Sequence, residues 1–445
     1  MFAHLSLFST IRIALVAMCL GARSAEPIED DLADFTSDLH QLHHAVTDPN
    51  SDLKFIISNF FDHRMDFDRF TQRVFNDYCE RILKDYDEFL SKSQLKKFVS
   101  VSNKRLQRGF RDYCITALEN YLRTSQFKEF HLSKVDGENN TFLISVPIST
   151  NTKTEIQQLV IHLDLGKSDR RIIDVETGNG LLLSEMIRSE FQEILNNNYS
   201  LPVLESKMRE QRYVVIEDFS TAEPGQLPEG WGWRDKDQDK PKLYSVIDAG
   251  QHRYLAAQDT GSSVILLKVA HWNPHKYPIL TWCWRAESLP PNADERYGPT
   301  NDSAAGLYVI FSQNWLGIPR QIKYVWSSTL PEGTVDRRKR FARPWFFVVE
   351  SGDKNVGQWT FEQVDLLADY RRVYSGKPQD RTRGLGILTD ANSTNSYAEA
   401  YYADFRVWTR EDLESGDINN HCKCLQDPSP EQQTSSRINP TRGGI

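Results

Sequence analysis

Apolar residues recur at intervals of three and four along residues 31–124, which is the pattern of amphipathic helices. Asp52 and Asp66 each precede one of these stripes, and aspartate is a preferred helix N-cap. A third stripe follows, and a fourth, longer one opens at Ser91. The pattern predicts a helical segment whose apolar faces need a common surface to cover them.

The next four segments alternate apolar and polar residues or are rich in β-branched residues, as expected of strands that are buried on one side. Hairpin-forming sequences at 137–140 and 166–169 separate them. Sequential hairpins predict an antiparallel sheet whose apolar face receives the helices. We expect these strands at residues 130–135, 141–148, 155–165 and 171–177.

A strand, a tight turn and a helix follow one another in residues 171–195. Gly178 and Gly180 tolerate positive φ, so the strand should end there. Beyond the turn, Leu183 and Phe191 belong to a helical stripe. The first half is therefore predicted to be an α+β domain, residues 28–212.

Composition changes after residue 212, and the pattern becomes one of short strands between turn signals rich in Gly and Pro. All ten tryptophans lie in this half. These features predict an all-β sandwich of jelly-roll or lectin-like type at residues 213–410. Beyond residue 417 the polar chain is expected to be a disordered tail, residues 417–445.

The N-terminus, residues 1–25, has a short apolar core followed by small residues, which is typical of a cleaved secretory signal peptide. Export permits disulfides, and the helical residues Cys79 and Cys114 form either a pair or two buried thiols. A net charge of −8 argues against a nucleic-acid partner. The sequence has no nucleophile-elbow, phosphate-loop or zinc-protease motif, so we expect no cofactor and no resident metal.

Acidic residues are plentiful in the second half, but none stands in a recognisable catalytic pair, and we expect them on the surface. Asp302 and Asp390 lie in loops where they either bind calcium or, as such residues more often do, cap their own turns. The full set is Asp294, Glu295, Asp302, Glu350, Glu362, Asp365, Asp390, Glu399 and Asp404.

Several short motifs in the first half resemble MlaC, the toluene-tolerance family of periplasmic phospholipid-binding proteins. They are IISNFF at 56–61, DFDRF at 66–70, IIDV at 172–175, GLLL at 180–183 and RSEF at 188–191. The resemblance implies helices on an antiparallel sheet with an apolar cavity between them for acyl chains. Because exposing one methylene to water costs about 0.8 kcal/mol, such a carrier must enclose the tails.

The wall of that cavity would come from large apolar residues of the helices and strands, and an ordinary packed core is the alternative for the same residues. The candidates are Phe60, Phe61, Phe67, Phe70, Val146, Ile161, Leu163, Ile173, Val175, Leu183, Ile187 and Phe191.

The second half resembles a family of secreted bacterial proteins known only as a domain of unknown function. The blocks that carry this resemblance are GWGW at 230–233, YLAA at 254–257, NDSAAG at 301–306, YVWSS at 324–328 and ILTDANST at 387–394. Sugars stack on exposed aromatic rings, so the tryptophans expected in loops are candidate glycan contacts: Trp231, Trp233, Trp272 and Trp315.

The sequence therefore predicts an exported, periplasmic protein that shelters phospholipid or another acyl lipid, in intermembrane lipid transport and in contact with membrane transport complexes. The first half is not expected to be an enzyme. The alternative is a secreted glycan-binding protein or glycoside hydrolase that acts through the second half.

Overall fold

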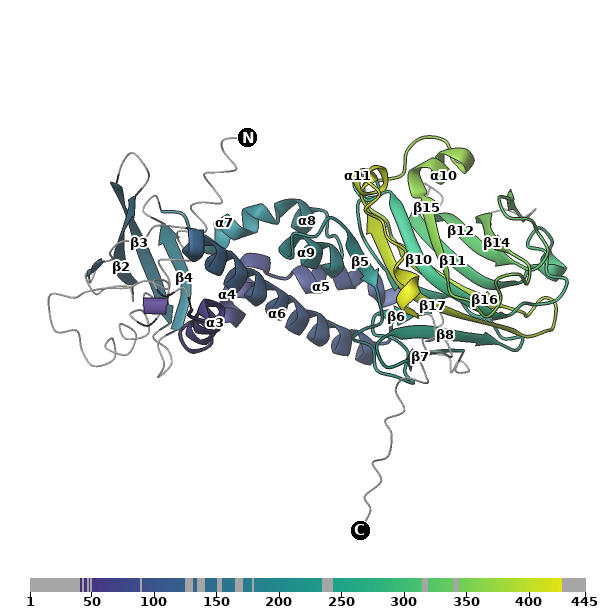
Figure 1. Cartoon of the computed structure of the whole chain (residues 1–445), viewed down its shortest axis with the longest axis horizontal. Coiled ribbons are helices and arrows are strands. Elements are labelled where there is room, and N and C mark those ends of the chain that lie inside the picture. Colours follow the sequence, from purple (N-terminus) through teal and green to yellow (C-terminus); the bar gives the residue numbers. More distant parts are fainter. Residues whose placement is uncertain are drawn as a thin grey trace, which may run out of the picture. The chain divides into compact units, whose positions relative to one another are not determined.

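The computed structural model describes most of the chain between residues 41 and 425. The described residues are 41, 44, 45, 48, 50–88, 90–124, 131–133, 141–149, 154–164, 171–177, 180–233, 243–313, 319–338 and 344–425. They belong to two compact units (Figure 1). The first unit runs to Ile82 and resumes at Val99–Arg209, and the second comprises Leu83–Phe98 and the chain from Glu210 onward. A single boundary at residue 212 therefore misses the short segment Leu83–Phe98.

Helices of the first unit begin where their caps predict. The side chain of Asp52 accepts a hydrogen bond from the Phe55 amide, and that of Asp66 accepts one from the Arg69 amide. The helices and turns of this part of the chain are α3 (Leu53–Arg64), α4 (Phe67–Phe75), α5 (Tyr78–Leu83), η1 (Lys84–Glu88), α6 (Lys92–Thr124), α7 (Leu183–Glu190), α8 (Gln192–Asn196) and α9 (Leu201–Met208).

Four strands of the first unit form an antiparallel sheet in chain order, as the hairpin pattern predicts. They are β1 (His131–Ser133), β2 (Thr141–Ser149), β3 (Thr154–Asp164) and β4 (Arg171–Thr177). Helices α3, α4 and α7 pack against the edge strand β4. The first unit thus combines helices with an antiparallel sheet.

The second unit is mostly β but not all β, because short helices accompany its two sheets. The six-stranded sheet contains β5 (Val214–Glu217), β7 (Tyr244–Asp248), β8 (Arg253–Asp259), β10 (Ile279–Ser288), β15 (Thr360–Asp365) and β17 (Ala398–Trp408). The seven-stranded sheet contains β6 (Trp231–Gly232), β9 (Leu266–Val269), β11 (Ser303–Gln313), β12 (Pro319–Ser327), β13 (Val335–Arg337), β14 (Trp345–Ser351) and β16 (Gly384–Asp390). Strands β12 and β14 pair in parallel, so this sheet is mixed.

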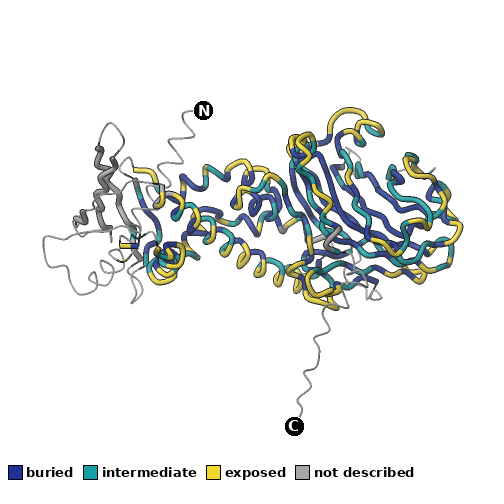
Figure 2. The backbone as a smooth tube through the Cα atoms, in the orientation of Figure 1, coloured by how far each residue is buried: buried dark blue, intermediate teal, exposed yellow. Residues whose placement is uncertain are grey.

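Aromatic side chains fill the space between these two sheets. Trp282 and Trp284 of β10 contact Tyr324 and Trp326 of β12, with ring centroids 5.6 Å and 6.1 Å apart. All four side chains are fully buried, in keeping with the buried strands that Figure 2 shows. The second unit therefore has its own core, closed by large rings.

Short helical elements complete the second unit. Asp365 ends β15 and caps α10 (Leu366–Val373), accepting from the amides of Leu367 and Ala368. A three-residue turn, η2 (Gly298–Thr300), precedes β11, and α11 (Arg410–Glu414) follows β17. Among the described residues, no helix is both long and apolar enough to cross a bilayer.

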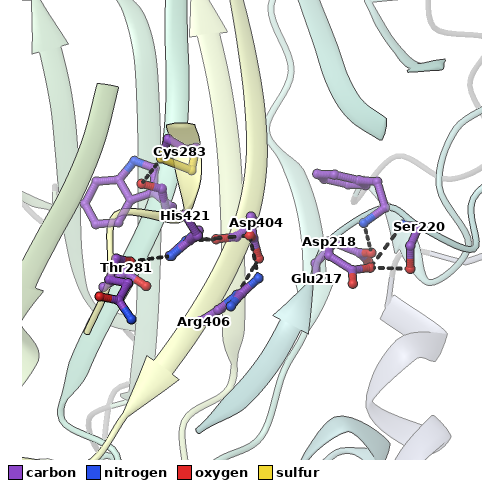
Figure 3. A network of polar contacts seen from close by, with 12 residues as sticks. Glu217, Asp218, Ser220, Thr281, Cys283, Asp404, Arg406 and His421 are labelled. Carbon is purple, nitrogen blue, oxygen red and sulfur yellow. Dashed lines mark hydrogen bonds and ion pairs between the residues drawn. A yellow bond between two sulfur atoms is a disulfide. The ribbon is translucent and has the colours of Figure 1, made fainter. Parts of the chain in front are cut away.

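The chain beyond residue 417 begins with an ordered turn, which corrects the expected start of the disordered tail. Residues His421–Leu425 form η3, and Cys422 is bonded to Cys283 of β10. His421 lies beside Asp404 of β17, which also accepts two hydrogen bonds from Arg406 at 2.7 Å (Figure 3). Residues 426–445 lie outside the described part of the chain.

Cys79 and Cys114 do not form a disulfide; both are free and buried. Burial raises the pKa of the Cys79 thiol to about 12, and it raises that of Cys114 well above its usual value. Both thiols therefore stay protonated and chemically inert at neutral pH.

The segment Leu83–Phe98 is anchored in the second unit by polar contacts. The Asp85 carboxylate lies 2.8 Å from His271 Nε2 and 2.9 Å from Arg381 Nη2. The Tyr86 hydroxyl donates to the Val269 carbonyl at 2.9 Å. These contacts explain why this helical stretch belongs to a mostly-β unit.

Candidate functional site

A cluster of phenylalanine rings around Phe110 of α6 forms the apolar centre of the helices in the first unit. The Phe110 centroid lies 6.3 Å from Phe67, 5.6 Å from Phe70 and 5.0 Å from Phe75. Phe75 in turn contacts Phe191 at 5.6 Å. Rings at these distances pack directly against one another, so the helices bury their own stripes here.

The structure distributes the twelve predicted wall residues among three environments. Phe67 and Ile173 are half-buried. Val146, Ile161 and Leu163 lie on β2 and β3, and their side chains are outside the described part of the structure. The fully or nearly fully buried members are Phe60, Phe61, Phe70, Val175, Leu183, Ile187 and Phe191.

Strand register aligns apolar positions across the sheet of the first unit. Phe142 of β2 pairs with Ile161 of β3, and Ile161 pairs with Val175 of β4. Val175 is fully buried on the strand against which α3, α4 and α7 pack. Residues paired directly across strands share a face of the sheet, so these three apolar register positions form one row.

A buried carboxylate fixes the start of α7 against the sheet. Asp174 accepts from the Ser184 hydroxyl at 2.5 Å and from the Ser184 amide at 3.2 Å. Arg73 of α4 donates to the same carboxylate at 3.1 Å. Asp174 is fully buried, and these hydrogen bonds from Ser184 and Arg73 compensate its charge.

The expectation of exposed loop tryptophans does not hold for two of the four glycan candidates. Trp231 is 1% exposed and Trp272 is 0% exposed, so neither ring is accessible to a sugar. Trp231 lies between Phe219 and Phe405, and its indole nitrogen donates to Glu217 at 3.0 Å. Trp233 is half-buried, and Trp315 lies outside the described residues.

Several acidic residues expected on the surface are buried or half-buried instead, and two of them, Glu362 and Glu350, interact. Glu362 of β15 accepts from the indole nitrogen of Trp284 at 2.9 Å. Burial, followed by the charge of Glu350, raises the pKa of Glu362 to about 8. Burial also raises the pKa of Glu350, which accepts from Asn355 at 3.2 Å and 3.3 Å. At neutral pH, Glu362 is therefore a protonated acid next to a second carboxyl group.

Buried Asp302 caps a loop, as turn residues usually do. Its carboxylate accepts from the amides of Ser393 and Thr394 and from the Thr394 hydroxyl, at 3.0, 2.6 and 2.6 Å. Asp390 is also buried, and its carboxylate accepts from Ser263 at 2.8 Å. Both side chains serve to join the loop around residue 393 to strand ends. Glu295 is buried as well, and its carboxylate accepts from Ser327 at 2.8 Å.

Within the described residues, no group of three or more His, Cys, Asp or Glu side chains is arranged to hold a metal ion. The two units thus offer different chemistry. The first has phenylalanine rings packed among its helices and a row of apolar register positions in its sheet, and the second has aromatic rings with buried acids.

Comparison with known proteins finds one family for the second unit. Residues 231–406 match the model of a family described as "Protein of unknown function (DUF3047)", over less than half of the chain. No curated protein matches the chain at a significant level.

Several solved structures show some similarity to parts of this chain. A phospholipid-binding protein from Ralstonia solanacearum, in complex with a phospholipid, is 17% identical, with 41% of this chain and 96% of that chain covered and a TM-score of 0.27. The xyloglucanase domain of the effector NopAA from Sinorhizobium fredii, in complex with cellobiose, is 11% identical, covering 42% and 96%, with a TM-score of 0.25. A family 29 carbohydrate-binding module from Piromyces equi is 14% identical, covering 46% and 97%, with a TM-score of 0.20. These weak likenesses establish neither a ligand nor an enzyme activity for this chain.

Proposed function

We propose that this chain is an exported, periplasmic protein whose first unit binds the acyl chains of a phospholipid or related lipid. The observation that carries the proposal is the apolar row of paired register positions Phe142, Ile161 and Val175, which share one face of the sheet. A second pair, Ile144 with Leu159, runs beside it. A surface of this kind suits hydrocarbon, because burying each methylene is worth about 0.8 kcal/mol.

The packing of the helices supports the same location for the lipid. The phenylalanine rings around Phe110 pack against one another, so the helices bury these apolar residues among themselves. Helices α3, α4 and α7 pack on β4, at one edge of the four-stranded sheet. An acyl chain lying along β2 and β3, beside this contact, would complete the apolar layer while its headgroup stays in water.

The proposal is tested by filling the lipid space with a larger side chain. Ile161→Trp puts a bulky residue at the centre of the apolar row, whereas Val160→Trp puts it at the neighbouring register position, which pairs with Glu176. We expect I161W to lower the extraction of fluorescent phospholipid from vesicles by at least about 10-fold, since overfilled cavities exclude ligand. V160W should extract lipid like the wild type. Equal extraction by both variants would argue against this site.

A further inference from the structure

The six-stranded sheet of the second unit carries a group of aromatic side chains on the face opposite its tryptophan core. Along β10, Cys283 alternates with the inward-facing Trp282 and Trp284, so Cys283 marks the outer face. Tyr254 of β8, Tyr401 of β17 and Trp359, which precedes β15, lie on this outer face around Cys283 and Ala403. We call these three side chains the aromatic platform.

The three rings of the platform contact one another directly. The Tyr254 centroid lies 5.3 Å from Trp359 and 5.0 Å from Tyr401, and Trp359 lies 6.4 Å from Tyr401. Tyr254 and Tyr401 are half-buried, in contrast to the fully buried rings between the two sheets. Part of each of these two rings is therefore accessible from the surface.

Strand register places residues of different size and charge on the two sides of Tyr401. Ala256 of β8 pairs with it on one side, and Arg285 of β10 pairs with it on the other. The methyl group of Ala256 projects less far from the sheet than a tyrosine ring does. The Arg285 guanidinium lies over the Tyr401 ring, 5.8 Å from its centroid. The Tyr401 ring is thus flanked by the small side chain of Ala256 and by the guanidinium of Arg285, which is a hydrogen-bond donor.

The carboxylate of Glu399 accepts several hydrogen bonds at one end of the aromatic platform. Glu399 accepts from the hydroxyls of Tyr397 and Tyr401 at 2.7 Å and 2.9 Å, and from the Gln258 amide at 3.0 Å. Gln258 and Tyr397 are exposed. Hydroxyls, an amide and a carboxylate therefore stand beside accessible rings, and each can exchange a hydrogen bond with a ligand hydroxyl.

The opposite end of the same face is covered by this chain itself. His421 of η3 lies against Phe361, with ring centroids 5.0 Å apart, and Leu425 packs on the cluster that holds the Cys283–Cys422 disulfide. The η3 segment therefore covers Phe361. The end of the face that contains Tyr401 and Glu399 is the part that is partly exposed to solvent.

We propose that the aromatic platform and Glu399 bind a glycan made of pyranose rings with equatorial hydroxyls. Such a ring has two apolar C–H faces that stack on tyrosine or tryptophan, and a rim of hydroxyls that both donate and accept. Tyr401 provides the stacking surface, Glu399 accepts hydroxyl protons, and Gln258 donates or accepts at the edge. This site differs from the four loop tryptophans and is separate from the lipid site of the first unit.

Isothermal titration of the full chain with cellohexaose, xylohexaose and chitohexaose tests this proposal. Tyr401→Ala should weaken binding of the recognised oligosaccharide by at least about 10-fold, because one stacking ring is lost. Gln258→Ala should weaken it by a smaller, measurable factor. Tyr297→Ala is the matched control, because Tyr297 is a 51% exposed tyrosine in a loop away from the platform, and this variant should bind like the wild type.

Folding of each variant is checked by circular dichroism, since Tyr401 is half-buried. The exposed Gln258 variant keeps the test decisive if Y401A misfolds. The proposal is overturned if none of the three oligosaccharides binds the wild type, or if Y401A or Q258A binds as tightly as Y297A. Lipid extraction by the same preparations reports separately on the first unit.

Discussion

The protonation state of Glu362 is decided by its surroundings and has a direct effect on stability. Its pKa in the folded protein is about 8, chiefly because burial disfavours the charged carboxylate, against a usual value of 4.5. An unfolded chain releases this proton near pH 4.5, whereas the folded chain keeps it until about pH 8. Stability associated with Glu362 is therefore intact below pH 4.5 and declines as the pH rises through this window.

Replacing Glu362 with glutamine should remove the part of the decline in folding stability with rising pH that Glu362 causes. Glutamine keeps an oxygen that accepts from Trp284 but has no proton to release. We expect Glu362→Gln to raise the free energy of unfolding at pH 7 by up to about 3 kcal/mol and to flatten its decline between pH 5 and 8. Urea denaturation across this range measures the effect. The exposed control Glu223→Gln should keep the wild-type slope, and a slope in E362Q equal to that of the wild type would contradict the assignment.

Residue chemistry alone could not predict which acids are buried. Aspartate and glutamate are mostly exposed in proteins, so the sequence predicts exposed side chains for them. This prediction is wrong for Asp174, Asp302 and Glu362, which are buried. Each has a hydrogen-bond partner distant in sequence: Arg73 for Asp174, Thr394 for Asp302 and Trp284 for Glu362. The expected exposure of Trp231 fails for a similar reason, since its ring packs against Phe219 and Phe405.

Elements whose signals are local were predicted well, and those that depend on distant pairing were not. The caps at Asp52 and Asp66, the hairpins of the first sheet and the turn at Gly180 all lie within a few residues of the element they define. The parallel pairing of β12 with β14 has no such local signal. The disulfide joins residues 139 positions apart, beyond what spacing reveals.

The Cys283–Cys422 bond should hold the C-terminal turn η3 on the six-stranded sheet. We expect Cys422→Ser to lower the stability of the second unit by about 2–4 kcal/mol, because the crosslink closes a long loop in the unfolded chain. Thermal unfolding monitored by tryptophan fluorescence reports on this unit, since all ten tryptophans lie in its sequence. Reduction should bring the wild type to the value of the variant and leave the variant unchanged. A wild type that reductant does not affect would contradict this role.

At the scale of the whole chain, the two units are interleaved in sequence. The segment Leu83–Phe98 belongs to the second unit although residues of the first unit flank it, and α6 runs continuously from one unit into the other. A linear division by composition misses this, because the segment reads as amphipathic helix and its anchor, Asp85, meets His271 and Arg381 much later in the chain. The first unit is therefore built from two separate stretches of the chain, and so is the second.

The central claim is that the first unit shelters an acyl lipid, and the lipid content of the purified full chain tests it most directly. Native mass spectrometry of protein prepared without detergent, with lipid extraction from the same sample, would identify any bound molecule. We predict an added mass of one phospholipid or related acyl lipid, which is lost in I161W and retained in V160W. A chain that carries no lipid and takes none from phospholipid vesicles would contradict the account.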